Sequence, residues 1–366
     1  MVDLRARLLR SIREIPRPQW EALWPPLAEG YDFYLCQEEA GIPGFEFVYL
    51  ALHDGEQPVL LAPLFGARFN MGLAMDDAWR ARLARLQRHA PWLLLFDTLF
   101  CGSPTSEKGL VAIHPAWQRR PELFTAFDRA LRQVAAERGA WMIVFKDFMD
   151  ADLPTLAPMK TLGWFVGDGL PTAALDLPYD SLDAYLASLS TGARKNMKRK
   201  LKKSGDAVQI EAVQDIEHCV DEVHRLYMNV HDHGPMSFEV LTRQFFLNFG
   251  RGMREHALFF LYWLPQVEGQ AGSGRRLVGF NLCLQFEDRL IDKYIGMDYA
   301  VSRELNLYFV SFLNNVRWCI ENGRRTYMLS QGGYEVKERL GARLIPMRTM
   351  TRIRNPMINW VAQRLA

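Results

Sequence analysis

Cysteine is scarce in this chain, and no two cysteines stand at the spacing of a redox or zinc motif. An odd and scattered set fits a reducing compartment better than a disulfide framework. No cysteine has a His–acid arrangement in its neighbourhood that would suggest an acyl-enzyme. We therefore interpret all five as small buried hydrophobic residues. They are Cys36, Cys101, Cys219, Cys283 and Cys319.

Long apolar runs are missing as well. The N-terminal segment MVDLRARLLRSIREI alternates charged with aliphatic residues and has no apolar core of signal-peptide length. No stretch approaches the roughly 18 apolar residues that a membrane-spanning helix needs. We expect a cytoplasmic protein without a transmembrane segment. The one low-complexity stretch, Gly269 to Gly274, is interpreted as a flexible connection between strands.

Net charge is also small. It is +2 over 366 residues, so the field of the whole molecule does not predict a polyanionic partner. Charge is instead concentrated in RKNMKRKLKK, residues 194–203, where seven residues in ten are basic. Ala193, Met197 and Leu201 recur every four residues there, which predicts a helix with one thin apolar seam.

Two interpretations of this basic helix stay open. It is either a solvated surface helix or a surface whose Arg194, Lys195 and Lys198 bind an anion. The anion could belong to a phosphate-bearing small molecule, a nucleic acid such as tRNA, or an anionic membrane touched peripherally.

What the sequence does contain is one order of elements that can be read twice. The clearer copy is C-terminal. Its helix carries Leu307, Val310, Leu313, Val316 and Ile320 at helical spacing, and Asn322-Gly323 ends it. The copy comprises a strand 289–299, that helix 306–321, a strand 326–330, a loop Gln331-Gly332-Gly333, a short helix 334–340 and a strand 344–353.

The earlier copy repeats this order with a strand 109–114, a helix 122–137, a strand 141–145, a short helix 155–162 and a strand 173–177. The 49% apolar content is ample for two cores. We expect an α/β protein, or α+β by strict layer count, of two fused units at 1–178 and 179–366. Each unit should be a mixed, mostly antiparallel sheet flanked by helices.

Three segments of the second half resemble the GNAT N-acyltransferase superfamily, in its tandem, Fem-like group. They are Leu189-Ser190 with GARKNMKRKLKK, the meander VGFNLCLQFEDRLIDKYIGMDY and the end SQGGYEVKERLGA. The order of elements is similar over most of the chain. The resemblance implies a bacterial-type acyltransferase whose second unit carries the site, whereas the first unit is degenerate.

The resemblance also implies the chemistry. Backbone N–H groups of splayed strands would meet a thioester, and a loop and helix N-terminus would hold phosphates. Here the loops 300–305 and 113–121 lack the glycines of the superfamily. Acyl-CoA is the favoured co-substrate, with no tightly bound cofactor. Two alternatives are a Fem-like transferase that uses aminoacyl-tRNA on an envelope precursor or peptide, and a non-catalytic binding protein.

Candidate residues follow from these patterns. The resemblance makes Lys337 a substrate-binding lysine, and Tyr334, one turn earlier, could protonate a leaving thiolate. Strand alternation predicts that Asp292 and Tyr294 share one face, toward an acceptor amine. His231 is a candidate base in a polar loop between helices. His231-Asp232-His233 lacks a third ligand, so no metal is expected. Candidates for binding the substrate or the donor are Tyr294, Asn306, Tyr308, Gln331, Gly332, Gly333, His233, Arg194, Lys195 and Lys198.

Overall fold

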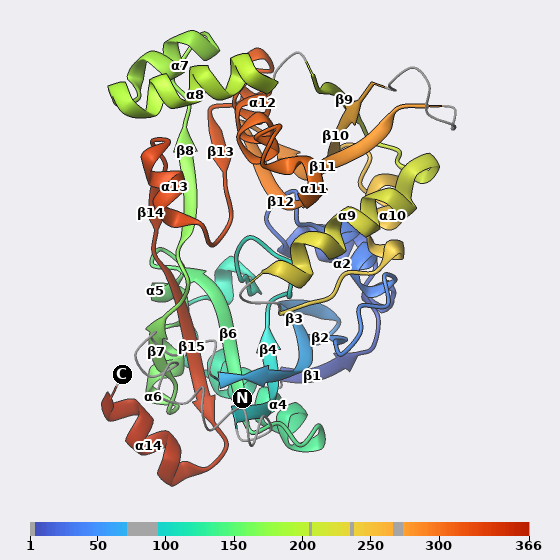
Figure 1. Cartoon of the computed structure of the whole chain (residues 1–366). Coiled ribbons are helices and arrows are strands. Elements are labelled where there is room, and N and C mark those ends of the chain that lie inside the picture. Colours follow the sequence, from blue (N-terminus) through green and yellow to red (C-terminus); the bar gives the residue numbers. More distant parts are fainter. Residues whose placement is uncertain (1–3, 72–93, 205–206, 235–237, 266–273, 366) are drawn as a thin grey trace. The chain divides into compact units, whose positions relative to one another are not determined.

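The computed structural model describes residues 4–71, 94–204, 207–234, 238–265 and 274–365, so most of the expected 269–274 connection lies outside the described residues. The chain divides into two compact units (Figure 1). Unit 1 comprises residues 1–38, 42–170 and 346–366, and unit 2 comprises residues 39–41 and 171–345. No described helix is both long and apolar enough to cross a membrane.

Unit 1 is built on a mixed sheet in the order β1-β2-β3-β4-β6-β15-β7, with β5 beside β3. Neighbouring strands on this path run antiparallel except β4 and β6, which are parallel. The strands are β1 (Leu4–Leu9), β2 (Glu46–Asp54), β3 (Gln57–Asn70), β4 (Leu95–Cys101), β5 (Ala112–Ile113), β6 (Met142–Met149), β7 (Phe165–Asp168) and β15 (Met347–Ile353).

Helices cover both faces of this sheet. The strand β2 turns Leu50 toward α4 and Tyr49 toward Trp20 of α1, because successive side chains of a strand alternate between faces. The long α4 buries Phe124, Phe127 and Leu131 at helical spacing. The α-helices of unit 1 within the described residues are α1 (Arg17–Leu23), α2 (Tyr31–Glu38), α4 (Pro121–Glu137), α5 (Leu153–Leu156), α6 (Pro158–Thr161) and α14 (Pro356–Leu365).

Unit 2 repeats the design with the sheet order β9-β10-β11-β12-β13-β8-β14. Here β12 and β13 are the parallel pair. The strands are β8 (Thr172–Asp176), β9 (Gln209–Val213), β10 (Ala257–Leu264), β11 (Arg276–Phe286), β12 (Arg289–Met297), β13 (Thr326–Met328) and β14 (Arg343–Ile345).

The helices α7, α8 and α12 pack together on one face of this sheet, and α9 and α10 contact β10 to β12. The aromatic contact between Phe246 of α10 and Phe280 of β11, with Asn281 turned toward α12, puts α9 and α10 on the opposite face. Gly296 permits α9 to approach β12, since a Cβ there would lie 2.7 Å from the Leu226 backbone. The helices are α7 (Leu182–Ser188), α8 (Thr191–Ser204), α9 (Val220–His233), α10 (Arg243–Gly252), α11 (Tyr299–Ser302), α12 (Leu307–Glu321) and α13 (Tyr334–Arg339).

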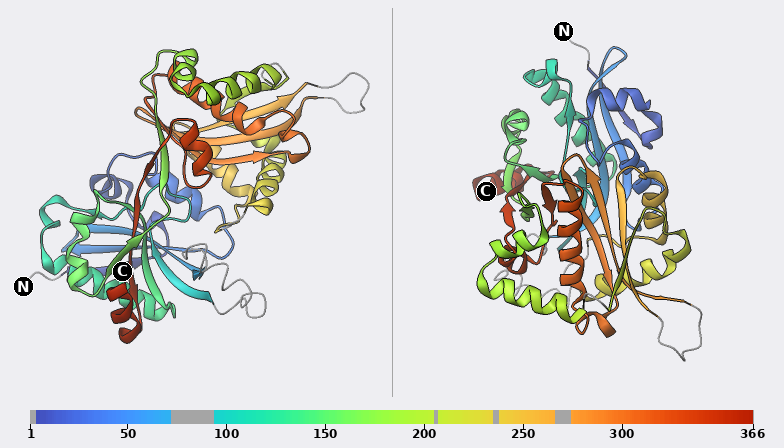
Figure 2. Two further views of the ribbon diagram at one scale, coloured as in Figure 1. Left: turned by 60° about the vertical axis from the view of Figure 1, so that its left-hand side comes forward. Right: turned by 90° about the horizontal axis from the view of Figure 1, so that it is seen from above.

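The two sheets exchange one strand each. β8 follows unit 1 in sequence but pairs with β13 and β14 in unit 2. β15 follows unit 2 in sequence but lies between β6 and β7 in unit 1. The views in Figure 2 show β15 running on from the second unit into the first sheet. The expected division at 178/179 therefore differs from the observed one at both crossings, because sequence order does not reveal which sheet a strand joins.

The doubled order of elements is otherwise present, and the α/β class with two mixed sheets flanked by helices is confirmed. One strand of the earlier copy was misplaced. The expected strand 109–114 is only the two-residue β5, and the central position next to β6 is taken by β4. Gly109 approaches the end of β6 closely, since a Cβ there would stand 2.1 Å from the Lys146 carbonyl oxygen.

Candidate functional site

The parallel pair β12/β13 of unit 2 separates in the middle of the sheet. Its paired residues end at Ile291 and Met328, after which β12 continues beside β11 alone. The Ser330 hydroxyl bridges the gap by donating to the Asp292 carbonyl. Ser330 itself has a left-handed backbone, φ 56°, which is uncommon for a residue with a side chain. Asp292 is the first residue of β12 beyond the paired part.

Asp292 belongs to a closed ring of four hydrogen bonds. Asn281 Nδ2 donates to Asp292 Oδ1 at 2.6 Å, and Tyr327 Oη donates to Asp292 Oδ2 at 2.7 Å. Asn315 Nδ2 completes the ring by donating to Tyr327 Oη at 2.7 Å and to Asn281 Oδ1. The four residues come from β11, β12, β13 and α12, so the ring ties the separated strands to the helix above them.

The hydrogen bonds of this ring all lead toward the carboxylate. Asn315 donates to Asn281 and Tyr327, and these two donate to Asp292. Asp292 accepts at each oxygen, which suits its ionised form. Asn281 and Asn315 are completely buried. Burial raises the pKa of Asp292, while the hydrogen bonds from Tyr327 and Asn281 and the charges of Lys337 and Lys293 oppose the rise. The arrangement is a carboxylate that is ionisable but more basic than usual.

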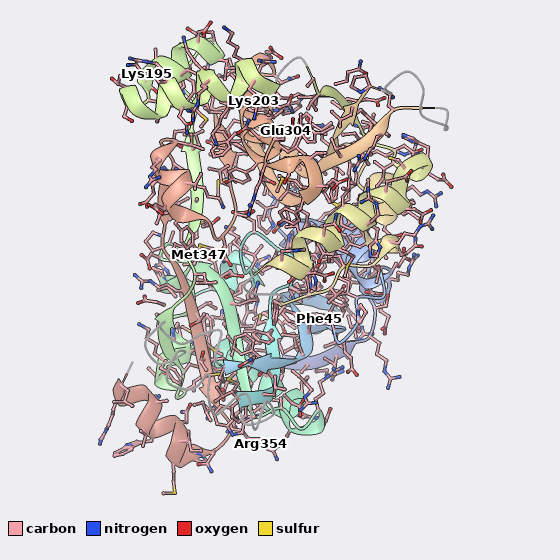
Figure 3. All side chains as sticks on the ribbon, in the orientation of Figure 1. Phe45, Lys195, Lys203, Glu304, Met347 and Arg354 are labelled. Atoms are coloured by element: carbon pink, nitrogen blue, oxygen red, sulfur yellow. The ribbon has the colours of Figure 1, made fainter. Side chains whose placement is uncertain are left out.

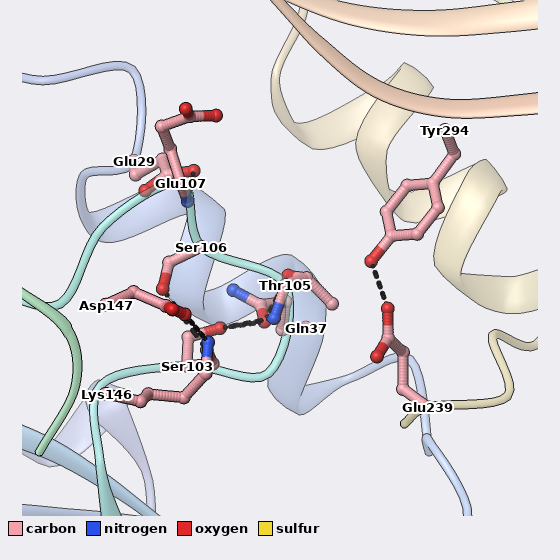
Figure 4. Close-up of polar contacts among 10 residues, drawn as sticks. All are labelled: Glu29, Gln37, Ser103, Thr105, Ser106, Glu107, Lys146, Asp147, Glu239 and Tyr294. Carbon is pink, nitrogen blue, oxygen red and sulfur yellow. Dashed lines mark hydrogen bonds and ion pairs between the residues drawn. The ribbon is translucent and has the colours of Figure 1, made fainter. Parts of the chain in front are cut away.

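Tyr294 does not share a face with Asp292, and the prediction that it does was wrong. A β-bulge at Lys293 pairs Asp292 with Cys283 and Tyr294 with Leu282. Because the extra residue breaks the alternation, Tyr294 points to the face covered by α9 and α10. There its ring lies against Tyr227 and Phe245, and its hydroxyl donates to Glu239 at 2.8 Å (Figure 4).

Lys337 is buried, with 7% of its surface exposed. Its ammonium donates to the carbonyls of Leu329, Ser330 and Gln331 at 2.5, 3.2 and 3.2 Å. It therefore organises the turn that follows β13, in which Gly332 and Gly333 have φ values of 77° and 61°. Its charge also lowers the pKa of Asp292. Lys337 therefore stabilises the loop beside the carboxylate.

Three further candidates lie on helices around this separation. Tyr334 donates to the Pro171 carbonyl at 2.8 Å. Burial raises the pKa of Tyr308 to about 12, with a contribution from the Asp292 charge. Asn306 precedes α12 as expected but makes no side-chain cap. It has a left-handed φ of 50°, and its amide donates to Ser204 of α8 at 3.1 Å.

The two histidines lie in the last turn of α9 and not in a loop between helices, because α9 continues to His233. His231 Nδ1 is 3.0 Å from Asp232 Oδ1. His233 Nδ1 is 2.8 Å from the Asn229 carbonyl, and its ring lies 4.8 Å from that of Tyr299. These residues belong to the α9 face of the sheet, whereas the Asp292 ring lies on the α12 face.

The basic helix has the expected seam. Met197 of α8 is buried, and Ala193 and Leu201 pack against the same core. Figure 3 marks Lys195 and Lys203 on α8. Lys198 lines a cleft with Asp183 and Arg317, among other residues of α7, α8 and α12. Arg194 donates to the Ala187 carbonyl at 3.1 Å, so it is partly used in joining α7 to α8.

This helix also adds positive charge near the start of α12. The Lys200 ammonium lies 3.1 Å from the centroid of the Phe309 ring. Ser204 at the end of α8 accepts from Asn306, which precedes the first turn of α12. A helix N-terminus carries partial positive charge, so lysines beside it reinforce the attraction for an anion.

Unit 1 has the corresponding separation. Its parallel pair β4/β6 ends at Cys101 and Phe145, and Asp147, two residues on, has a left-handed φ of 58°. Ser330 of unit 2 stands two residues beyond the end of its own pair in the same conformation. The position and strain are repeated although the sequences differ.

Side chains of unit 1 itself make polar contacts at its separation (Figure 4). Lys146 donates to the Ser103 carbonyl at 3.1 Å and forms an ion pair with Asp147. The hydroxyls of Ser103 and Thr105 both donate to Gln37 Oε1.

Several residues of both separations were missed from sequence, although a polar Asn315 inside the apolar α12 was a usable signal. They are Asn281, Asn315, Tyr327, Ser103, Lys146 and Asp147.

Both the sequence and the structure of the chain are similar to known proteins. A family model described as FemAB-like, peptidoglycan biosynthesis/recognition, matches residues 11–359. The structure is similar to that of FemX, with TM-score 0.58 at 11% identity, covering 98% of this chain and 100% of that one. It is also similar to a tandem GNAT protein from the clavulanic acid biosynthesis pathway, with TM-score 0.56 at 12% identity and coverage of 97% and 99%.

A third similar structure is the C-terminal domain of a lysylphosphatidylglycerol synthetase from Agrobacterium fabrum. Its TM-score is 0.57 at 12% identity, and the match covers 97% of this chain and 96% of that one. No curated protein sequence matches the chain. At such identities these likenesses show a common fold.

Proposed function

The chain belongs to the FemAB-like family of peptidoglycan biosynthesis and recognition proteins, and from this premise we propose that it is an N-acyltransferase. It moves an acyl group from an activated donor to an amine by direct transfer. The observation that carries the proposal is Asp292, held at the separation of β12 and β13 by a ring of hydrogen bonds. Function is argued here from this site, because the fold alone hosts many activities.

The proposed step needs a base and an acid. An amine that attacks an acyl carbonyl forms the N–C bond and must lose a proton, which Asp292 accepts. The pKa of Asp292 is raised by burial, so its carboxylate is a stronger base than an exposed one. The C–S bond of a thioester donor breaks, and the thiolate takes a proton. Tyr308 is the proposed source, since its phenol lies close enough to Asp292 for that charge to act on it and is protonated at neutral pH; burial raises its pKa to about 12, so it is a weak acid.

Acyl-CoA is the donor we favour. Its pyrophosphate would meet the N-terminus of α12, which is supported by Lys200 and the rest of α8. No glycine lies between Gly296 and Gly323, and the left-handed Asn306 provides the turn into α12 instead. The second candidate donor is an aminoacyl-tRNA, favoured by the density of basic residues on α8. Both donors use the same positive region and differ in how much of α8 they contact.

Activity of Asp292→Asn tests the catalytic role. The exchange keeps the size of the side chain but removes the base, so the turnover of acyl transfer should fall about 10²- to 10⁴-fold. An asparagine amide accepts at only one of the two positions where Asp292 accepts, so one hydrogen bond of the ring is lost, and thermal unfolding verifies that the variant is folded. The raised pKa means that the folded state opposes ionisation, so the stability of the wild type relative to this variant falls as pH rises from 3.8 through the folded-state pKa. A variant with full turnover would contradict the proposal.

A thermal-shift titration identifies the donor. Purified protein is mixed with coenzyme A, acetyl-CoA, a long-chain acyl-CoA or bulk tRNA at low and moderate salt. Stabilisation by a CoA species supports the favoured donor, and the best acyl length indicates the group transferred. Stabilisation by tRNA alone, lost with salt and in a variant of α8 with neutralised lysines, supports aminoacyl transfer. No response to any of them favours a non-catalytic binding protein.

A further inference from the structure

The C-terminal helix α14 presents an apolar face to solvent. It begins after Asn355, whose side chain accepts from the N–H groups of Met357 and Ile358 at 3.0 and 3.2 Å, and Pro356 occupies the first helical position. Five large apolar side chains are exposed on it: Met357 by 80%, Ile358 by 44%, Trp360 by 52%, Val361 by 47% and Leu365 by 83%. They are half of the exposed large hydrophobic side chains found among the described residues.

An ordinary surface helix turns its apolar side toward the protein, whereas α14 turns its apolar side toward solvent. At 100° per residue, its exposed apolar side chains and Arg364 occupy one continuous arc of about 160°. The opposite side carries Asn359, which is buried. Asn359 accepts from the Ile353 N–H at 2.8 Å and donates to the Gly163 carbonyl at 2.8 Å. The polar residue thus anchors the helix to unit 1 and leaves the apolar arc outward.

The C-terminal sequence that carries this helix has charges of one sign. Residues 340–366 contain five arginines and no aspartate or glutamate. Arg343, Arg348 and Arg352 form ion pairs with aspartates. Within the described ranges, no acidic side chain pairs with Arg354 or Arg364 at the ends of α14. Arg354 is marked in Figure 3 at the start of this helix.

Trp360 and Arg364 are paired on the arc, with the guanidinium 3.5 Å from the centroid of the indole ring. Tryptophan and arginine are favoured at the boundary between headgroups and acyl chains, where apolar rings and charged groups are both accommodated. A protein partner with a dry apolar groove would leave these arginines without acids unless it supplied them. An anionic lipid surface supplies both an apolar layer for the arc and negative charge for the arginines.

We propose that α14 is a membrane-docking helix that lays its Met357–Leu365 apolar arc into the surface of an anionic bilayer, with Arg354 and Arg364 at the headgroups. This inference is independent of the proposed acyl transfer. A ten-residue helix buries a limited apolar area, so binding is reversible and weakened by salt. It would bring unit 1 to a lipid surface without a membrane-spanning segment.

Vesicle co-sedimentation of the full chain tests this proposal. We expect at least tenfold tighter partitioning to vesicles with about one-third phosphatidylglycerol than to pure phosphatidylcholine vesicles. The variant Met357→Ser/Trp360→Ser/Leu365→Ser should bind at least tenfold more weakly, and Arg354→Gln/Arg364→Gln should lose the preference for anionic lipid. The matched control is Ile210→Ser/Val240→Ser, two exposed apolar residues elsewhere, which should bind as the wild type does.

Three results would overturn the proposal. The wild type could ignore anionic vesicles. It could bind them equally well after the α14 substitutions but not after Lys195→Gln/Lys198→Gln, which would assign the contact to α8. Or light scattering could show a dimer that the apolar variant dissociates while vesicle binding is unchanged, which would identify a second copy of the chain as the occupant. Thermal unfolding of each variant verifies that the exposed substitutions leave the fold intact.

Discussion

Asp292 is a single carboxylate whose hydrogen-bond donors in the ring are neutral side chains. Its two oxygens accept from an amide and a phenol, and a second amide orients both of these donors. Lys337 and Lys293 lower its pKa through their charges. Removing one member of the ring should therefore change the basicity of Asp292 before it changes the fold.

The pH dependence of Tyr327→Phe tests this expectation. The phenol lowers the pKa of Asp292 by donating to its carboxylate, so its loss raises that pKa. A general base works in its ionised form, and the acidic limb of a kcat/KM profile should move to higher pH in the variant. The measurement is the profile from pH 4 to 9 for wild type and variant. An unshifted limb would show that Asp292 does not titrate in the step.

Lys337→Met tests the structural part of the site. The substitution leaves three carbonyls of the 329–331 turn without their ammonium donor, which should cost about 1–3 kcal/mol in the free energy of unfolding. Urea unfolding measures this cost. Arg339→Met, exposed on the same helix, is the matched control and should change stability by less than about 0.5 kcal/mol. Full stability with lost turnover would instead make Lys337 a substrate-binding residue.

Among the elements, β12 has the largest effect on which face of the sheet each functional residue points to. The bulge at Lys293 turns Asp292 to the α12 face and Tyr294 to the α9 face. The helix α8, by contrast, follows its sequence pattern directly, because a seam of Ala193, Met197 and Leu201 has only one way to be buried.

Deleting Lys293 tests the bulge. Without the extra residue, one half of β12 must turn its side chains to the other face, because the side-chain period of a strand is two. We expect a loss of about 3 kcal/mol or more in the free energy of unfolding and loss of turnover, measured by urea unfolding and activity. Lys293→Gln keeps the bulge and should lose much less stability than the deletion. Equal stability of the deletion and Lys293→Gln would contradict this account of the strand.

At the scale of the whole molecule, each unit depends on a strand from the other half of the sequence. β15 lies between β6 and β7, and β8 lies between β13 and β14. Neither half of the chain can complete its sheet alone. The expected units 1–178 and 179–366 would each contain one strand too many for their own sheet and lack the one that belongs there.

Removing residues 346–366 tests this interdependence. The truncation takes β15 out of the middle of the unit 1 sheet, so hydrogen exchange should show lost protection in β6 and β7 while β10 to β12 of unit 2 remain protected. A chain that ends at Arg354 keeps β15 and is the control; it should protect β6 and β7 as the full chain does. Equal loss in both units would mean that the two fold as one cooperative body.

The fold class, the tandem repeat, α12 and the seam of α8 could be predicted from sequence, because each depends on local periodicity. The helix stripe with Leu307, Val310, Leu313 and Val316 is buried as expected. The family resemblance was confirmed for the same reason, since it was read from the order of elements. Local patterns of this kind are a property of each segment and survive in any context.

Tertiary structure alone decided the pairing of strands and the faces of the site. The bulge at Lys293 exists because two strands meet in one register, and no period in β12 announces it. Asn281, Asn315 and Tyr327 are far apart in sequence and become one ring only where β11, β13 and α12 converge. The sequence by itself thus determined the elements and their order, whereas long-range contacts determined which carboxylate is buried, what holds it and which sheet receives β15.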